Sequence, residues 1–233
     1  RSATLQAVRD ARLLRLSKAN FEQLIVRHPQ VMIQIARIQS KRVRLLSVRP
    51  PHSTTLTTLA VIPASPDVPL TECCQRLASA LSPYGSSLHL TSERLEDEMQ
   101  MGPLSHDEND GMIVAWLSEQ EMKYRFIIYE SDLQPSSWTS RCLRQADHIL
   151  IVGQASAKPE LGEIEREVHH MSQAHQSLLL LHPNGEQLPV GTKKWLAPRQ
   201  VEQHHHLRWN MKGDFERVAR LRVTDHPRDR RER

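Results

Sequence analysis

Unbroken apolar runs are the feature that most constrains the fold of this 233-residue chain. Two of them, 149–152 (Ile-Leu-Ile-Val) and 178–181 (four leucines), show no alternation of polar and apolar residues. A strand of this kind has both faces covered, as in a parallel sheet packed between helices. From residue 57 onward, such strand-sized runs alternate with amphipathic helical segments. The sequence therefore predicts an α/β fold with an open, doubly wound, mostly parallel sheet.

The hydrophobic periodicity also predicts where the strands and helices of this sheet lie. Strands are expected at 59–63, 87–90, 124–129, 148–153, 177–182 and 204–209. Helices are expected at 69–81, 112–121, 138–145 and 159–172. The polar segment 99–110 is expected to form an exposed loop, and the charged ending 222–233 a disordered tail.

The first fifty residues follow a different pattern. Two short stretches, 4–8 and 12–16, are expected to form a hairpin-like pair of strands. Ser17 is a suitable N-cap for a helix over 18–27. A second helix, with a proline in its first turn, is expected over 29–46.

Pro50 and Pro51 interrupt the helical pattern and predict a linker. The chain is expected to divide into an N-terminal region at 1–48, a linker at 49–56, an α/β domain at 57–210 and a C-terminal segment at 211–233. Lys and Arg outnumber Asp and Glu by 11 to 2 in the first fifty residues, whereas the balance in the remainder is 20 to 25. The cations of the first part are interleaved with an apolar stripe, so they are predicted to cover the solvated face of a helix. The acidic balance of the second part argues against a nucleic-acid partner.

Cysteine content argues against a disulfide-rich protein, and hydropathy argues against a membrane-spanning helix in this chain. Three cysteines, two of them adjacent, cannot form a disulfide framework, and they indicate a reducing, cytosolic environment. No apolar run approaches the ~20 residues that a helix needs to cross a bilayer.

Motifs that bind phosphates, metals or acyl groups are missing from the sequence. The eight glycines match neither a P-loop nor a dinucleotide-binding fingerprint, and no Gly-x-Ser-x-Gly motif is present. Of the thirteen histidines, His169, His170 and His175 lack the spacing of ligands on one helix face. Neighbouring histidines in 204–206 would point to opposite faces of a strand. The sequence therefore assigns no metal ligand and no cofactor.

A row of carboxylates is a candidate for a catalytic pair. Glu163, Glu165 and Glu167 flank Arg166, and no apolar pocket nearby would separate their pKa values. They are predicted to lie on a solvated helix face, so no catalytic residue is assigned in this chain.

The first residues resemble the end of a cyclic-nucleotide-binding domain. In that family an Arg-[Ser/Thr/Ala]-Ala-Thr stretch, here Arg1 to Thr4, closes the phosphate-binding cassette before a strand pair and helices. The resemblance implies that Arg1 would pair with the cyclic phosphate and that the Ser2 amide would lie beside it. A guanidinium matches two anionic oxygens. The first part of the chain is thus expected to be the remnant of a cyclic-nucleotide-binding β-roll with its C-terminal helices.

Several ordered segments resemble the neuropathy-target-esterase type of lysophospholipase, a patatin-like phospholipase with cyclic-nucleotide-binding-like domains. After 1–44, the similar segments are LTTLAVIPASPDVPLTE, WLSEQEMKYRFIIYESD, SSWTSRCLRQADHILIVG, PELGEIERE and SLLLLHP. The most distinctive residues are Trp138-Thr139 with Cys142, 144–147 (Arg-Gln-Ala-Asp) and 161–163 (Leu-Gly-Glu). The resemblance covers roughly residues 1–210.

The resemblance implies an enzyme on the cytosolic face of the endoplasmic reticulum membrane that deacylates phosphatidylcholine and lysophosphatidylcholine to glycerophosphocholine. Its patatin domain carries a Ser-Asp dyad and an oxyanion turn. Residues 214–221 resemble the lead-in to that domain, but the dyad and the turn are missing here. The chain is therefore expected to be a fragment, itself soluble and without esterase activity, that forms the regulatory and connecting region. Its expected partners are the patatin domain of the parent chain and a phospholipid membrane reached through other segments. Arg1 and Ser2 are the candidate residues for a cyclic nucleotide, but binding by this chain alone is not expected, because the glycine and the glutamate that complete the family's pocket would precede residue 1.

Two other interpretations remain open. The chain could be a cyclic-nucleotide sensor or protein-interaction module without a link to an esterase. Alternatively, the α/β domain could bind a small ligand at the carboxyl ends of its strands, around Gly153 and 182–185. A cyclic-nucleotide-responsive transcription factor is disfavoured, because strand patterns follow the two prolines and the balance of charge there is acidic.

Overall fold

The computed structural model describes residues 16–28, 32, 56–100, 110–172, 174–182 and 191–224. The chain divides into two compact units, residues 1–55 and 56–233, and each is considered by itself. The boundary between the units falls inside the segment predicted to be a linker.

In the first unit the structure describes one helix, α1 (Lys18–Arg27). The Asn20 amide donates a hydrogen bond of 3.2 Å to Oγ of Ser17, so the predicted helix and its N-cap are both confirmed. The predicted strand pair and second helix lie outside the described residues, apart from Leu16 and Met32. The candidate phosphate ligands Arg1 and Ser2 also lie outside them.

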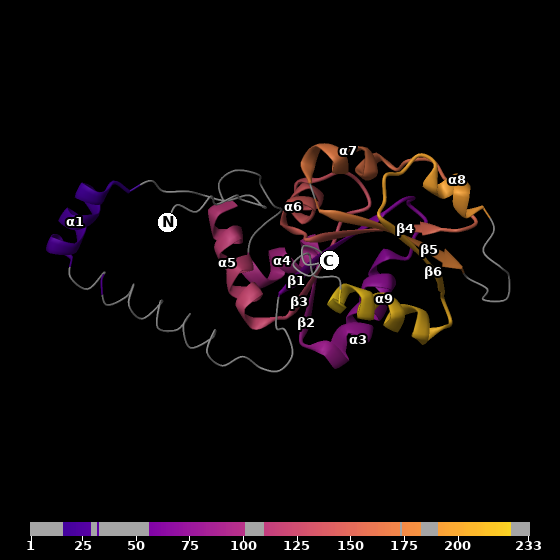
Figure 1. Cartoon of the computed structure of the whole chain (residues 1–233), viewed down its shortest axis with the longest axis horizontal. Coiled ribbons are helices and arrows are strands. Elements are labelled where there is room, and N and C mark those ends of the chain that lie inside the picture. Colours follow the sequence, from indigo (N-terminus) through magenta and orange to yellow (C-terminus); the bar gives the residue numbers. More distant parts are fainter. Residues whose placement is uncertain are drawn as a thin grey trace, which may run out of the picture. The chain divides into compact units, whose positions relative to one another are not determined.

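The second unit is built on a six-stranded sheet with the order β2-β3-β1-β4-β5-β6, in which every neighbouring pair is parallel (Figure 1). The strands are β1 (Thr57–Pro63), β2 (Ser87–Leu90), β3 (Phe126–Glu130), β4 (His148–Gln154), β5 (His175–His182) and β6 (Gln203–Arg208). The prediction of an open, doubly wound α/β fold is therefore confirmed. The first strand lies between β3 and β4, so the chain switches direction across the sheet at β1, where ligands bind in folds of this type.

Helices cover both faces of the sheet (Figure 1). One face packs against α3 (Leu70–Leu81) and α9 (Lys212–Thr224), and a short 3-10 turn, η1 (Ser82–Tyr84), follows α3. The other face packs against α4 (Ser92–Met99), α5 (Asp110–Lys123), α6 (Ser137–Gln145), α7 (Glu163–Met171) and α8 (Thr192–Leu196). Among the described residues, no helix is long and apolar enough to span a membrane.

The unbroken apolar runs divide their side chains between two hydrophobic cores. Ile149 and Ile151 belong to the core beneath α4–α8, whereas Leu150 and Val152 belong to the core beneath α3 and α9. All four are at most 2% exposed. The four leucines of β5 divide in the same way, which explains why neither strand needs a polar face.

Two regions differ from the sequence predictions. No helix was expected at α4, where seven of the eight residues are polar, charged or only partly buried and only Leu95 is buried. The prediction of a disordered tail over 222–233 is wrong for 222–224, which lie inside α9, and the rest of it lies outside the described residues. Arg222 is 4% exposed. It follows Phe215, Val218 and Ala219 on the buried face of that helix, where its aliphatic stem packs and its Nη2 donates to Oε1 of Gln203 at 2.6 Å.

Candidate functional site

The segment between β1 and α3 has the strand–loop–helix arrangement of a phosphate-binding loop. In the P-loop motif Gly-x-x-x-x-Gly-Lys-[Ser/Thr], the loop follows a strand and opens a helix. β1 ends at Pro63 and α3 begins at Leu70. Counting from Ala64, the two glycine positions hold Ala64 and Pro69, the lysine position holds Leu70, and the hydroxyl position holds Thr71. The spacing of the motif is therefore present without its glycines and lysine.

Backbone amides of this loop are used within the protein. A phosphate cradle needs several amide N–H groups directed at the anion. Here the Ala64 amide donates to the Val152 carbonyl at 2.7 Å, and the Leu70 amide donates to the Val68 carbonyl at 2.8 Å. Pro69 has no amide hydrogen at all. The amides of Ala64 and Leu70 are thus already bonded to protein carbonyls, and the lysine that holds a nucleotide phosphate is missing from the loop.

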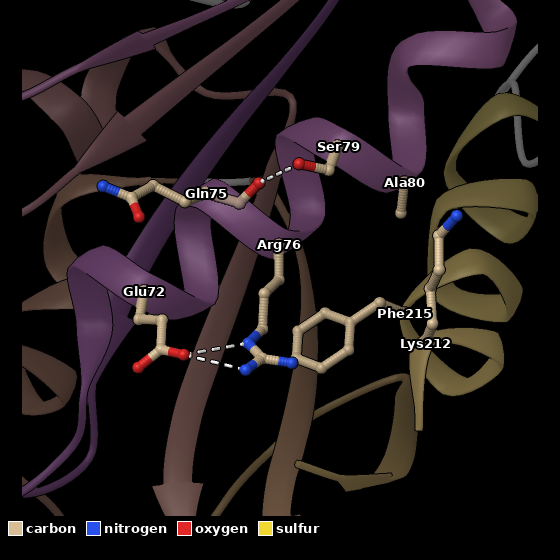
Figure 2. A pocket seen from close by; sticks show the side chains of 7 residues that line it. All are labelled: Glu72, Gln75, Arg76, Ser79, Ala80, Lys212 and Phe215. Carbon is tan, nitrogen blue, oxygen red and sulfur yellow. Dashed lines mark hydrogen bonds and ion pairs between the residues drawn. The ribbon is translucent and has the colours of Figure 1, made fainter. Parts of the chain in front are cut away.

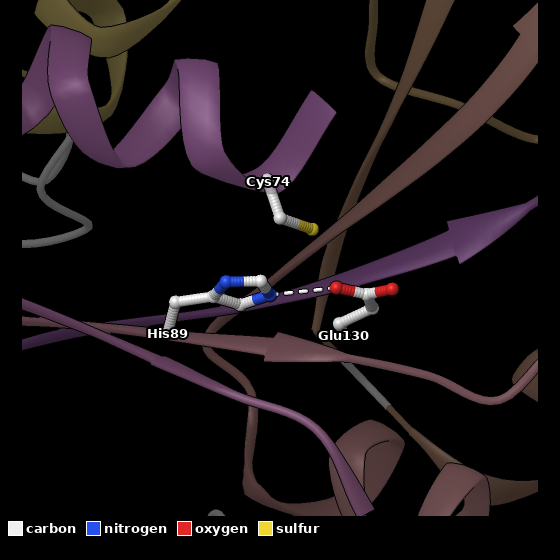
Figure 3. Close-up of side chains that lie close together, drawn as sticks. All are labelled: Cys74, His89 and Glu130. Atoms are coloured by element: carbon white, nitrogen blue, oxygen red, sulfur yellow. Dashed lines mark hydrogen bonds and ion pairs between the residues drawn. The ribbon is translucent and has the colours of Figure 1, made fainter. Parts of the chain in front are cut away.

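The carboxylate of Glu130, at the end of β3, gathers side chains from two other elements (Figure 3). Its Oε1 accepts a hydrogen bond of 2.5 Å from Thr71 Oγ1 on α3, and its Oε2 lies 2.6 Å from Nε2 of His89 on β2. Cys74 lies three residues beyond Thr71 on α3, with its sulfur directed at the same point. One ligand atom each from Cys74, His89 and Glu130 lies within 4.8 Å of the other two.

Residues from the distinctive segment at 138–142 hold the backbone of Glu130. Trp138 is 1% exposed, and its Nε1–H donates to the Glu130 carbonyl at 2.7 Å. The Cys142 sulfur lies 4.0 Å from the same carbonyl oxygen. Trp138 also makes an edge-to-face contact with Tyr129, with ring centroids 6.0 Å apart. Trp138 and Cys142 therefore fix the position of the acidic residue at the end of β3.

The Cys74, His89 and Glu130 cluster does not have the properties of a nucleophilic triad. Burial raises the pKa of the Cys74 thiol well above its ordinary value of 9.0, and the nearby Cys73 and Glu130 raise it further. A reactive cysteine needs the opposite shift, because the thiolate is the nucleophile. The neighbouring Cys73 is also buried, with its pKa raised to about 12 chiefly by desolvation. Both thiols are therefore protonated and unreactive in the absence of a metal ion.

The sequence placed a candidate ligand site at Gly153, near the carboxyl end of β4. A Cβ atom added there would lie 2.7 and 2.8 Å from Cζ3 and Cη2 of Trp195. Glycine is thus required by the close approach of the indole, which covers this face of the strand end. On the opposite face, a cavity of about 130 Å³ is lined by Pro69, Gln154, Leu181 and Trp209. This volume is below the range of typical small-molecule sites.

A larger groove of about 380 Å³ lies between α3 and α9 (Figure 2). The Arg76 guanidinium lies in it, 4.4 Å from the centre of the Trp209 ring, and donates to Oε1 of Glu72 at 2.8 Å. Lys212, on the other side of the groove, pairs with Glu216 at 3.5 Å. Because both cations are already paired with carboxylates, the groove does not favour an anionic ligand.

At the end of β5, His182 joins a chain of polar contacts. Its Nε2 lies 2.8 Å from Nδ1 of His206, whose Nε2 lies 3.1 Å from Oγ1 of Thr192. Desolvation lowers the pKa of both imidazoles. The remainder of the predicted ligand region, 183–185, lies outside the described residues.

His205 lies on the face of β6 opposite to His206, and its burial is expected to make the stability of the fold depend on pH. Its pKa is lowered from 6.5 to about 4, chiefly by burial and also by the positive charges of Arg222 and Arg217. Between these two pH values the unfolded chain binds a proton at His205 that the folded chain does not. The contribution of the neutral His205 to the free energy of unfolding is therefore complete above pH 6.5 and is lost as the pH falls toward 4. The loss from His205 between about pH 7 and pH 5 is expected to be about 1 kcal/mol, after its partial exposure is allowed for.

Thermal unfolding followed by circular dichroism would measure this effect. His205→Gln should show a smaller decrease in Tm than the wild-type chain over that pH interval. An identical decrease in the two proteins would show that another group carries the dependence.

Glu165 departs from its predicted role. It was expected on a solvated helix face, but it is 3% exposed because it folds back over the start of α7. Its Oε1 accepts from the Gly162 amide at 3.0 Å, and both of its oxygens bind Arg199. Arg199 also donates to three backbone carbonyls, those of Pro159, Glu160 and Trp195. The segment around 161–163 therefore encloses a buried ion pair.

The candidate ligands that sequence reasoning missed are Cys74, His89 and Glu130, together with Thr71, which donates a hydrogen bond to the Glu130 carboxylate. The signals available were the P-loop spacing that ends at Thr71 and a carboxylate directly after the apolar run of β3. Within the described residues, His175 and the histidines of 204–206 join no comparable cluster of three ligand groups, and the side chains of His169 and His170 lie outside the described part. Among the described rings, His175 pairs with Glu202 at 2.5 Å, and His205 lies on the other face of β6 from His206.

The fold has a counterpart among solved structures. A crystal structure of a plasmid partition protein from Borrelia burgdorferi aligns with 71% of this chain and 97% of its own, with a TM-score of 0.50. The two sequences are only 10% identical, so the likeness concerns the fold alone.

Sequence comparisons identify the family. The model of the "Neuropathy Target Esterase family P-loop like domain" matches residues 55–225. Lysophospholipase NTE1 of Yarrowia lipolytica is 33% identical over 91% of the chain, and neuropathy target esterase sws of Drosophila erecta is 33% identical over 97%. Patatin-like phospholipase domain-containing protein 6 of Pongo abelii is 32% identical over 89%. The chain spans only 16–17% of the length of these three relatives. This chain belongs to the neuropathy target esterase family, and residues 55–225 are its P-loop-like domain.

Proposed function

We propose that this chain is the regulatory and connecting region of a neuropathy-target-esterase-type lysophospholipase. In this proposal the parent enzyme deacylates phosphatidylcholine and lysophosphatidylcholine to glycerophosphocholine at the endoplasmic reticulum membrane, on its cytosolic face. The chemistry takes place in a patatin domain outside these residues, and the P-loop-like domain packs against it. Family membership and the relative named lysophospholipase support the proposal.

The proposed connecting role rests on the residues of the loop between β1 and α3. We call this a scaffold role, because it requires a stable framework and no bound nucleotide. The frame of a P-loop is present, but Ala64, Pro69 and Leu70 occupy the positions of its two glycines and its lysine. The loop amides of Ala64 and Leu70 are bonded to protein carbonyls. A domain with this loop supplies a stable framework rather than nucleotide chemistry. The assignment of cyclic nucleotide to Arg1 and Ser2 stays a prediction.

Titration calorimetry with Mg²⁺-ATP and Mg²⁺-GTP tests the scaffold role. The purified chain is expected to show no saturable binding up to about 1 mM nucleotide, because a phosphate without its cradle gains too little interaction energy. A protein with an intact P-loop motif, titrated in the same buffer, is the positive control. Saturable binding with a Kd below about 100 μM would contradict the proposed role.

A further inference from the structure

We propose that Cys74, His89 and Glu130 form a zinc site that fastens the start of α3 to the β2–β3 edge of the sheet. Each residue comes from a different element, and their ligand atoms lie within 4.8 Å of one another (Figure 3). Cys74 is 0% exposed, and the side chains of His89 and Glu130 are 16% and 10% exposed. The proposal of a zinc site does not depend on the proposed connecting role, since it rests only on the positions of these three side chains.

The donor atoms select the metal. Thiolate, imidazole and carboxylate are the three ligand types that zinc binds in proteins, whereas Mg²⁺ and Ca²⁺ prefer oxygen ligands alone. A thiolate from Cys74, a carboxylate from Glu130 and a neutral imidazole from His89 balance the two positive charges of the ion. A neutral complex is favourable in a site as enclosed as this one, because an uncompensated buried charge is strongly disfavoured.

The distances require only a small rearrangement. Around a tetrahedral zinc ion, nitrogen and oxygen ligands lie about 3.4 Å apart, given metal–ligand bonds of about 2.0–2.1 Å. His89 Nε2 and Glu130 Oε2 are 2.6 Å apart when hydrogen-bonded to each other, so they must separate by somewhat less than 1 Å. Rotation of the two side chains supplies this movement. Three protein ligands leave the fourth position of the ion to water.

Neighbouring residues already orient the carboxylate. Thr71 donates to Oε1 of Glu130, which directs Oε2 toward His89 and Cys74. Trp138 holds the Glu130 carbonyl at 2.7 Å and so fixes the end of the strand. Supporting hydrogen bonds of this kind orient the ligands of known metal sites. Zinc binding displaces the thiol proton of Cys74, and the affinity is therefore expected to fall as the pH is lowered.

The experiment uses the whole 233-residue chain, freed of metal with a chelator that is then removed. Zinc chloride is titrated in competition with a chromogenic chelator, and bound zinc is measured by elemental analysis after dialysis. We expect one tightly bound zinc ion per chain. Cys74→Ser should weaken its binding at least about tenfold, whereas the matched control Cys73→Ser, at the adjacent buried cysteine, should leave it unchanged.

Cobalt provides a second readout that histidines elsewhere cannot imitate. Co²⁺ in place of zinc should give the near-ultraviolet absorption of a thiolate–cobalt bond in the wild-type and Cys73→Ser chains, but not in Cys74→Ser. Circular dichroism checks that each variant is folded. If Cys74→Ser does not fold, the wild-type cobalt spectrum decides by itself, since absence of the thiolate band overturns the proposal. Zinc affinity unchanged in a folded Cys74→Ser chain would likewise overturn it, by placing the metal elsewhere.

Discussion

Replacing Arg199 by methionine is expected to lower the free energy of unfolding of the α/β unit by about 3–5 kcal/mol, because Glu165 would remain buried without a countercharge. The two side chains are 1% and 2% exposed, and Arg199 Nε and Nη2 bind the carboxylate at 2.7 and 2.8 Å. The guanidinium also satisfies three backbone carbonyls, which would lose their donor. Urea unfolding followed by circular dichroism measures the change.

A surface ion pair provides the matched control. Arg94 and Glu98 lie one turn apart on α4 at 3.9 Å, with side chains 47% and 52% exposed. Arg94→Met should lower the free energy of unfolding by less than about 0.5 kcal/mol. The double variant Arg199→Met, Glu165→Met should recover much of the lost stability, since it removes the buried charge as well. A loss below about 1 kcal/mol for Arg199→Met would show that Glu165 is hydrated or protonated in the folded chain.

Replacing Trp138 by alanine is expected to lower the free energy of unfolding by about 3–5 kcal/mol, since it removes a large side chain that is fully enclosed. The indole lies against Tyr129 and donates its N–H to the Glu130 carbonyl. Trp138→Phe separates these two contributions, because it keeps most of the packing and removes the donor. The phenylalanine variant should lose about 1–3 kcal/mol for the carbonyl left without its partner.

The control for this prediction is Trp116, a tryptophan of α5 that packs at the edge of the same core and is only partly buried. Trp116→Phe should change the free energy of unfolding by less than about 1 kcal/mol. Both series use urea unfolding of the same chain. Equal losses for Trp138→Phe and Trp116→Phe would contradict a specific role for the hydrogen bond to Glu130.

Much of the fold could be predicted because its strands are buried on both faces. The runs at 149–152 and 178–181 lack polar residues in a way that few structures other than a covered parallel sheet permit. The helix at α3 was also predictable from its apolar spacing. The order of the strands was not, because it depends on which neighbours each strand meets in three dimensions.

The two charged residues whose burial the sequence did not predict, Arg222 and Glu165, were mispredicted for the same physical reason. Arg222 and Glu165 carry charges, and their sequence neighbours suggest solvated surface. Arg222 is buried through its aliphatic stem at a helical repeat of Phe215 and Val218, and Glu165 through its pairing with Arg199, 34 residues away. Local sequence does not reveal such partners. In α4, capping by Thr91 and the single buried Leu95 accompany a helix that has almost no apolar stripe.

The candidate site was hidden for a similar reason. A search for phosphate-binding loops depends on glycines, and this loop retains only the spacing and the hydroxyl of Thr71. Cys74, His89 and Glu130 are isolated in the sequence and converge only when α3, β2 and β3 pack together. Gly153 stands out in the sequence because it ends an apolar strand. Glycine is required there by the close approach of the Trp195 indole, and not by a ligand.

The most direct test of the proposed connecting role is lysophosphatidylcholine hydrolysis by the purified 233-residue chain, measured as released fatty acid and compared with a heat-treated sample. We expect the two samples to be indistinguishable, because the chain lacks the Gly-x-Ser-x-Gly nucleophile motif. Turnover that exceeds the heat-treated control, rises in proportion to chain concentration and is lost when the chain is unfolded in urea would contradict the proposal and place an esterase site within these residues.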